Sequence, residues 1–193
     1  MIVAQGVEAG GHVRGELGLL PLLDGVLDAV DVPVVAAGGI GTARAMAAVL
    51  ASGADAVRVG TRFIASREAG ESGAHPAYVD AILRASAEDA VLTEAFSVMW
   101  PDAPHRVLRS CVEAAEAFHG EVVGELRMAG VTMPLPRLAV PSPTRETTGA
   151  IEAMALYAGQ SVGAVQEVQS AAEIVRELAE GAEQLLGEAG QAG

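Results

Sequence analysis

The sequence predicts an α/β fold built around a parallel sheet, and three observations in its first 61 residues support this. Three short apolar runs, at 2–5, 34–37 and 55–59, have the continuous hydrophobicity of strands buried on both faces. Two segments between them, 19–30 and 43–50, carry apolar residues at helical spacing. A glycine follows each strand run. Strands that alternate with helices form a parallel sheet, and ligands bind such sheets at the carboxyl ends of the strands.

Residues at the helix ends agree with this assignment. Thr42 is a suitable N-cap for the second helix, and Gly53 ends it. After residue 61 the pattern is looser. We predict helices near 76–83, 107–115, 151–157 and 174–185, a strand or extended segment at 91–96, and a Pro- and Gly-rich surface excursion at 120–148.

Composition and charge exclude several classes of protein. Hydrophobic residues make up 51% of the 193 residues, which is not a disordered composition. The formal net charge of −13 argues against nucleic acid and anionic membranes as partners, because both repel an acidic surface. No apolar run reaches the roughly 18 residues of a membrane span, and no basic leader precedes the first strand. We therefore expect a cytoplasmic location.

The cysteine and three of the histidines do not indicate a metal site or a nucleophile. Cys111 is the only cysteine, so it forms no internal disulfide, and its apolar neighbours at helical spacing predict an inert buried thiol. His75, His105 and His119 lack the spacing of metal ligands, and we expect them at the surface or in packing roles. We predict no metal site.

Glycine turns after two neighbouring strands predict a phosphate site. Gly38 and Gly39 stand between the second strand and its helix, and Gly60 and Thr61 follow the third strand. Glycine lets the backbone approach a ligand closely, and free N–H groups at a helix start bind phosphate without a basic side chain. One such turn can simply reverse the chain. Two turns that are adjacent in a parallel sheet form an N–H-rich cup, with the Thr61 hydroxyl as a further donor.

The loop between the first strand and the first helix carries the best candidate for acid–base chemistry. His12 stands beside Gly10 and Gly11 rather than on an apolar helix face, which makes a core histidine less expected. A neutral imidazole with a pKa near 6.5 can accept a proton at physiological pH. Gln5 ends the first strand, where its amide would either contact the polar edge of a bound ring or orient the loop.

Taken together, these motifs resemble the nitronate monooxygenases, formerly called 2-nitropropane dioxygenases. The resemblance covers nearly the whole chain, and the spacing between the motifs fits as well. It rests on Gln5-Gly6-Val7-Glu8-Ala9-Gly10-Gly11-His12, Val35-Ala36-Ala37-Gly38-Gly39-Ile40, Val59-Gly60-Thr61-Arg62-Phe63, Ala74-His75-Pro76-Ala77-Tyr78 and Met154-Ala155-Leu156-Tyr157-Ala158-Gly159-Gln160.

The resemblance implies the C-terminal part of an FMN-binding TIM (β/α)₈ barrel, with parallel strands, covering helices and a helical C-terminal extension. Residues 1–66 would hold its last three strands, and residues 67–193 a helical and loop extension packed on the barrel within a single domain. His12 matches the catalytic base of the family. The positions that match its cofactor site are Gln5, Gly10, Gly11, Gly38, Gly39, Arg58, Val59, Gly60 and Thr61.

The implied reaction is the oxidation of an alkyl nitronate or nitroalkane by O₂ to a carbonyl compound and nitrite. FMN-dependent enoyl-acyl-carrier-protein reductases look similar through the same Gly-Gly-His loop and Ala-His-Pro stretch, so this activity is an alternative. Family members have about five further βα units before these strands, and three strands cannot close a barrel. We therefore expect a fragment, a chain completed by a partner chain, or a dimer of half-barrels. A non-catalytic half-barrel is the second alternative.

Overall fold

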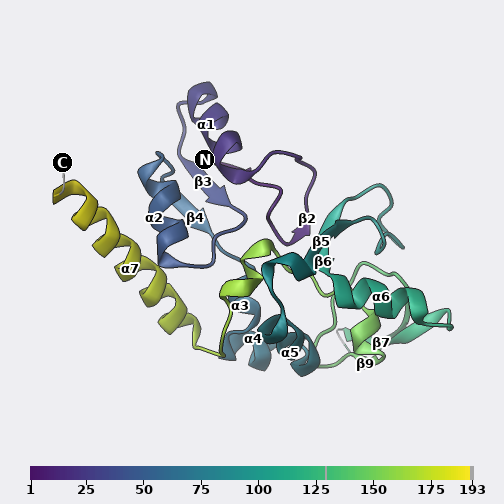
Figure 1. The fold of residues 1–193 in the computed structure, drawn as a ribbon. Helices are drawn as coiled ribbons and strands as arrows, with labels where there is room; N and C mark the ends of the chain where they lie inside the picture. Colours follow the sequence, from purple (N-terminus) through teal and green to yellow (C-terminus); the bar gives the residue numbers. More distant parts are fainter. Residues whose placement is uncertain (129, 192–193) are drawn as a thin grey trace.

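The parallel sheet expected in the first 61 residues is present. The structure, a computed structural model, describes residues 1–128 and 130–191. Strands β1 (Ile2–Gln5), β3 (Val34–Ala37) and β4 (Ala56–Arg58) run parallel in the order β1-β3-β4 (Figure 1). In the register of this sheet Gln5 pairs with Ala37, and Ala37 pairs with Arg58. The carboxyl ends of all three strands therefore meet at one edge.

Two helices cover one face of this sheet. Helix α1 (Leu19–Ala29) packs on β1 and β3, and α2 (Ala43–Ala51) lies beside β4. Thr42 caps α2 as expected, because its hydroxyl accepts a hydrogen bond from the Ala45 N–H at 3.2 Å. The opposite face is uncovered, and Val3 on it is 44% exposed. The residues buried between the sheet and these helices are Ala4, Leu19, Leu23, Val34, Ala36, Ile40, Val49 and Ala54.

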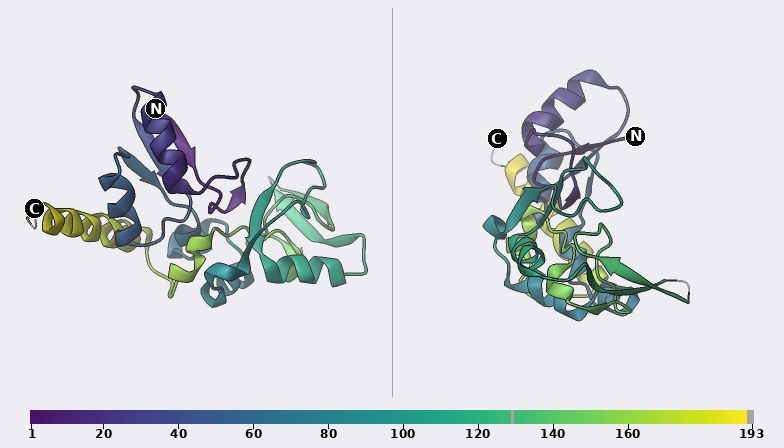
Figure 2. Two further views of the ribbon diagram at one scale, coloured as in Figure 1. Left: turned by 45° about the horizontal axis from the view of Figure 1, so that its top comes forward. Right: turned by 90° about the vertical axis from the view of Figure 1, so that its right-hand side faces the viewer.

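The C-terminal helix α7 (Ala171–Gln191) packs against α2, as Figure 1 shows. A Cβ atom added at Gly181 would lie 2.7 Å from the Cβ of Ala43, so the glycine permits a close approach of the two helices. In the left view of Figure 2, α7 and the strands at 122–128 and 131–136 lie at opposite ends of the molecule.

The segment after β4 begins with short helices and then a second sheet. Helices α3 (Thr61–Ile64), α4 (Arg67–Ser72) and α5 (Pro76–Arg84) follow in sequence, and η1 (Ala87–Asp89) is a single 3₁₀ turn. The second sheet is antiparallel in the order β2-β6-β5, and it ties the loop after β1 to the distant part of the chain. Its strands are β2 (Gly11–His12), β5 (Ala90–Thr93) and β6 (His105–Leu108).

Two predictions for this region need correction. The helix expected at 107–115 begins only at Arg109, as α6 (Arg109–Ala117), because Val107 and Leu108 belong to β6. The excursion expected at 120–148 contains a β-hairpin, β7 (Val122–Met128) with β8 (Val131–Pro136), joined by β9 (Thr148–Gly149). The sequence did not predict this hairpin because β8 contains two prolines, and proline usually marks an edge strand or a loop.

The helix expected at 151–157 is only one turn, η2 (Ile151–Ala153). Beyond it the chain is extended, and the Leu108 N–H donates to the carbonyl of Leu156 at 2.9 Å. A further 3₁₀ segment, η3 (Gln160–Ala164), follows. The apolar residues of 151–158 belong to a second hydrophobic core, which is larger than the one beneath the parallel sheet. This core surrounds the segment on several sides, so its apolar residues do not form the stripe of a helix. Its fully buried members include Ile82, Phe96, Val107, Cys111, Ala115, Ala155, Ala158 and Val162.

None of the helices in the described part of the chain combines the length and apolar character needed to cross a membrane. Among residues 1–128 and 130–191, no group of three or more His, Cys, Asp or Glu side chains is arranged to hold a metal ion.

Candidate active site

A cavity of about 410 Å³ lies at the carboxyl ends of the three parallel strands. Four segments distant in sequence line it: the loop after β1, the turns after β3 and β4, and residues 157–161. The structure places nine of the ten residues singled out from the sequence on this cavity, namely Gln5, Gly10, Gly11, His12, Gly38, Gly39, Arg58, Gly60 and Thr61. Val59 is not among the lining residues, because its side chain packs against the core of the parallel sheet.

The turn after β3 requires glycine at two consecutive positions. Gly38 has φ +103° and Gly39 has φ +70°, a region of backbone conformation that side chains disfavour. A Cβ atom at Gly38 would also lie 3.0 Å from the carbonyl oxygen of Gly6. Glycine is therefore needed here because the loop after β1 packs directly against the turn, and both glycines line the cavity without a side chain.

The turn after β4 adds a hydroxyl and a cation. Thr61 begins α3, is buried, and its Oγ1 accepts a hydrogen bond from the Gly159 N–H at 2.9 Å. Because the hydroxyl is an acceptor in that contact, its own proton stays available for a ligand. Arg58 ends β4 with an exposed side chain, and its guanidinium forms no hydrogen bond or ion pair with the residues that the structure describes.

The loop after β1 is held from both sides. The amide nitrogen of Gln5 donates to the carbonyl oxygen of His12 at 3.0 Å, so Gln5 orients the loop. The guanidinium of Arg106 donates from Nε and Nη2 to the carbonyl of Val7, at 3.0 and 2.8 Å, and from Nη1 to the carbonyl of Ala90 at 2.8 Å. The carboxylate of Glu8 accepts from the Leu19 N–H and caps α1.

The loop also packs tightly on the segment at 157–161. A Cβ atom at Gly10 would lie 2.5 Å from the backbone nitrogen of Gly159, and one at Gly159 would lie 2.8 Å from the nitrogen of Gly10. The Gln160 N–H donates to the carbonyl of Glu8 at 2.9 Å. Paired glycines therefore bring two backbones into direct contact at the wall of the cavity.

His12 is packed among aromatic rings. Its imidazole stacks on Trp100 with ring centroids 4.2 Å apart, and the Tyr157 ring lies 5.8 Å away. The Nε2 atom of His12 is buried and has no hydrogen-bond partner among the described residues. Burial, and then the nearby His105, lower the pKa of His12 below its usual 6.5. The ring is therefore mainly neutral at physiological pH, with a lone pair available to accept a proton.

His105, His75 and Cys111 have structural contacts. His105 is fully buried, where its Nε2 accepts from the Phe96 N–H at 3.2 Å and its Nδ1 lies 2.9 Å from the Ala103 carbonyl oxygen. His75 caps α5 through Nδ1. Burial raises the pKa of the Cys111 thiol to about 12, so this thiol stays protonated.

Several residues at or near the site were not identified from the sequence. Gly159 and Tyr157 belong to a segment that carried the family resemblance, which was the one available signal for them. Trp100, Arg62 and Arg106 each make a contact with a residue more than 80 positions away in sequence, and no local pattern indicates such contacts. The lining residues missed are Val3, Ala9, Ala37, Ile40, Ile64, Tyr157, Gly159 and Ser161.

A glycine-lined cavity at the carboxyl ends of parallel strands, covered by helices on one face, defines a ligand site of the α/β-barrel class. The chain belongs to the nitronate monooxygenase family, because the family model described as nitronate monooxygenase matches residues 1–181. Its fold is accordingly part of a TIM barrel.

Curated relatives carry the same description. A probable nitronate monooxygenase of Bacillus subtilis (strain 168) is 30% identical over 190 residues, which cover 92% of this chain and 50% of the relative. One of Staphylococcus aureus (strain Newman) is 41% identical over 106 residues, which cover 50% of this chain and 29% of the relative. The chain thus spans half or less of the length of these relatives.

Two solved structures are similar over nearly the whole chain. The structure of FabK from Thermotoga maritima has a TM-score of 0.71 and 32% identity, and the match covers 98% of this chain and 56% of FabK. The nitroalkane oxidase of Streptomyces ansochromogenes has a TM-score of 0.67 and 34% identity, with 98% and 52% of the two chains covered.

Proposed function

We propose that this chain contributes the phosphate-binding side and the catalytic base of an FMN-dependent nitronate monooxygenase. The observation that carries the proposal is the single cavity that joins the two glycine turns to the loop bearing His12. One flavin mononucleotide carries a phosphate group at one end and the reacting ring at the other. In this proposal the two glycine turns bind the phosphate, and the loop that bears His12 lies beside the ring.

The chemistry of the lining fits a phosphorylated cofactor. Gly38, Gly39 and Gly60 line the cavity without side chains, and a Cβ atom added at Gly60 would meet no other atom within 4 Å. Thr61 keeps a hydroxyl proton free, and Arg58 offers an uncompensated cation. In a chain of net charge −13, an isolated arginine at a glycine turn is a local exception that favours an anion. When bound, FMN would take electrons from the substrate and pass them to O₂.

In this proposal His12 prepares the substrate. Its neutral imidazole takes the α-proton of a nitroalkane from carbon, and the electron pair left behind forms the nitronate. A substrate that is already a nitronate does not need this step. Gln5 and the paired glycines Gly10 and Gly159 hold the loop so that the imidazole stays at the cavity. The proposed substrates are an alkyl nitronate or nitroalkane together with O₂.

The function is tested by oxygen uptake. Purified protein with added FMN should consume O₂ and release nitrite with propionate 3-nitronate or 2-nitropropane. The outcome that excludes the proposal is the absence of turnover by a version that also contains the remaining barrel strands.

The same preparation distinguishes the alternative enoyl-acyl-carrier-protein reductase. That activity would appear as NAD(P)H oxidation that depends on a crotonyl thioester. Rapid oxidation of this kind, without nitrite formation from nitronates, would replace the proposed function by the reductase.

We expect His12→Ala to separate two classes of substrate. Turnover of neutral nitroalkanes should fall by about 10²-fold or more, which is the usual contribution of a general base. Turnover of preformed nitronates should fall much less, since their proton is already gone. Steady-state oxygen uptake measures both rates, and an equal loss on the two substrates would contradict the role of His12 as a base.

We further infer that polypeptide outside these 193 residues covers the open side of the cavity. Strands β1 and β4 are the two edges of the parallel sheet, and Val3 and Arg58 on them are exposed at the cavity. Three strands cannot close a barrel, so the opposite wall would come from further strands of a longer chain or from a second chain. If neither is available, the chain would bind FMN weakly and remain non-catalytic.

A further inference from the structure

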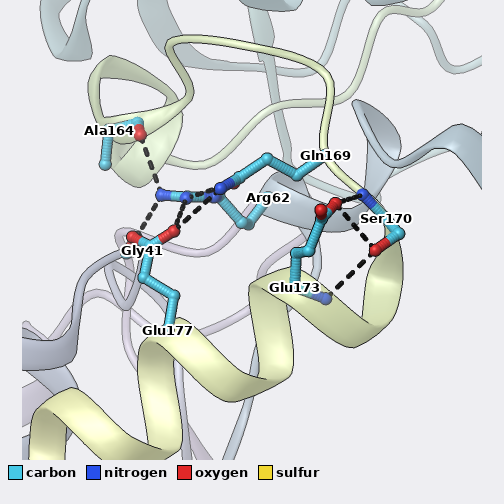
Figure 3. Close-up of polar contacts among 7 residues, drawn as sticks. All are labelled: Gly41, Arg62, Ala164, Gln169, Ser170, Glu173 and Glu177. Carbon is cyan, nitrogen blue, oxygen red and sulfur yellow. Dashed lines mark hydrogen bonds and ion pairs between the residues drawn. The ribbon is translucent and has the colours of Figure 1, made fainter.

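Arg62 is a buried arginine that directly follows Thr61 of the proposed phosphate site, and Figure 3 shows its contacts. Its Nη1 donates to the carbonyl oxygens of Gly41 at 3.1 Å and Ala164 at 3.0 Å. Its Nη2 donates to Oε1 of Gln169 and to Oε2 of Glu177, both at 2.7 Å. Both terminal nitrogens of the guanidinium are therefore engaged, and none of these four partners is a cavity-lining residue.

The partners of Nη1 belong to segments that line the cavity elsewhere. Gly41 directly follows Ile40 in the turn after β3, and Ala164 ends η3, which carries Ser161. Arg62 itself directly follows Thr61 in the turn after β4. One guanidinium thus holds three walls of the cavity in a fixed relation to one another.

The partners of Nη2 connect the Arg62 guanidinium to the C-terminal helix. Glu177 lies on α7. Gln169 contacts both residues, because its Nε2 also donates to Oε2 of Glu177 at 3.1 Å. The carboxylate neutralises the buried guanidinium and fixes its orientation, as charge-assisted hydrogen bonds do. Helix α7 is also packed on α2 at Gly181, so contacts other than that of Glu177 help to hold its position.

We propose that Arg62 and Glu177 form a latch through which α7 sets the spacing of the two phosphate-binding turns. Arg62 and Glu177 are then positioning residues for the phosphate group, although neither lines the cavity. This inference rests on the proposed function, because it concerns the same phosphate site. It predicts that a change on α7 alters recognition of the phosphate and leaves recognition of the flavin ring unchanged.

A second ion pair on the same helix supplies a matched control. Arg67 donates from Nη2 to Oε2 of Glu173 at 2.7 Å, the same distance as in the latch. The Arg67 side chain is 56% exposed, whereas that of Arg62 is 8% exposed. Glu173 also accepts from Ser170 at the start of α7, so its loss weakens the helix without touching the guanidinium of Arg62.

The test compares dissociation constants for FMN and riboflavin, measured by quenching of flavin fluorescence on the wild-type protein and three variants. Riboflavin carries the same ring and lacks the phosphate. Glu177→Ala should bind FMN about tenfold more weakly, which is the loss of one charge-assisted contact, and should bind riboflavin as the wild type does. Glu177→Gln restores an acceptor for Nη2 and should recover most of the FMN affinity. Glu173→Ala should match the wild type for both flavins.

Two results would overturn the latch. One is an equal loss of FMN and riboflavin affinity in Glu177→Ala, which indicates general loosening of the fold. The other is unchanged or tighter FMN binding in Glu177→Ala, which indicates that the guanidinium acts by charge alone. A different result would reject the proposed phosphate site itself: the wild-type protein would then bind FMN no more tightly than riboflavin. Amide hydrogen exchange provides a readout without flavin: residues 58–63 should exchange faster in Glu177→Ala than in Glu173→Ala, and equal exchange argues against the latch.

Discussion

At the scale of single residues, the environment of His12 decides what its imidazole can do. Burial lowers the pKa of His12 because it disfavours the charged form, and the stacked Trp100 covers one face of the ring. The neighbouring His105 acts in the same direction. A general base with a lowered pKa keeps its neutral form at mildly acidic pH, so base-dependent activity should persist below pH 6.5 before it falls.

We expect Trp100→Ala to raise the pKa of His12 toward its usual value. The truncation uncovers one face of the ring and so reduces the burial that lowers the pKa. The acidic limb of the pH–rate profile on a neutral nitroalkane should then move to higher pH. NMR titration of the imidazole proton signals measures the pKa directly. Trp100→Phe, which keeps an aromatic ring over His12, should remain near the wild type, and a pKa that falls in Trp100→Ala would refute this account.

At the scale of elements, the loop at 6–18 has little regular structure of its own and depends on β6. Strand β2 pairs His12 with His105 and Gly11 with Arg106, and the guanidinium of Arg106 holds the carbonyls of Val7 and Ala90. The fold thus positions the glycine-rich end of the site through a buried arginine that lies about 100 residues away in sequence.

We expect Arg106→Met to destabilise the protein by about 2–3 kcal/mol, because it leaves the buried carbonyl of Ala90 and the half-buried carbonyl of Val7 without their charged donor. Urea unfolding followed by circular dichroism measures this change. Arg127→Met on the exposed face of β7 is the control and should stay within about 0.5 kcal/mol of the wild type. Equal stability of the two variants would show that Arg106 does not anchor the loop.

The sequence predicts some of these elements and not others, for physical reasons. Strands β1, β3 and β4 and helices α1, α2, α5 and α7 are anticipated because each has a local signature, either a continuous apolar run or a helical apolar stripe. The β7–β8 hairpin is not, because Pro134 and Pro136 resemble loop residues. The strand at His105–Leu108 is merged with the following helix because its burial on all sides leaves no alternation.

The residues of the candidate site likewise fall into those that the sequence predicts and those that it does not. Backbone features such as Gly38, Gly39 and Gly60 can be located from the sequence, because glycine after a strand is a local signal. Side chains that act at a distance, such as Arg62 and Trp100, cannot, because their partners are set by tertiary packing.

At the scale of the whole molecule, the cavity depends on contacts between the parallel sheet and the later part of the chain. Residues 157–161 form one wall, Arg62 joins both glycine turns to α7, and the larger core surrounds Cys111 and Phe96 away from the cavity. The uncovered face of the sheet at Val3 is the side on which further barrel strands would complete the proposed flavin pocket.

Titration of the ¹⁵N-labelled protein with FMN, and separately with riboflavin, followed by amide NMR, tests whether this cavity is a flavin site with its phosphate at the glycine turns. Weak binding is sufficient for this measurement. FMN should shift the amide signals of Gly39, Gly60 and Thr61 together with those of Gly11 and His12, whereas riboflavin should shift only the signals of the His12 loop. If FMN leaves both glycine turns unchanged, or if riboflavin shifts them equally, the proposed phosphate site is wrong.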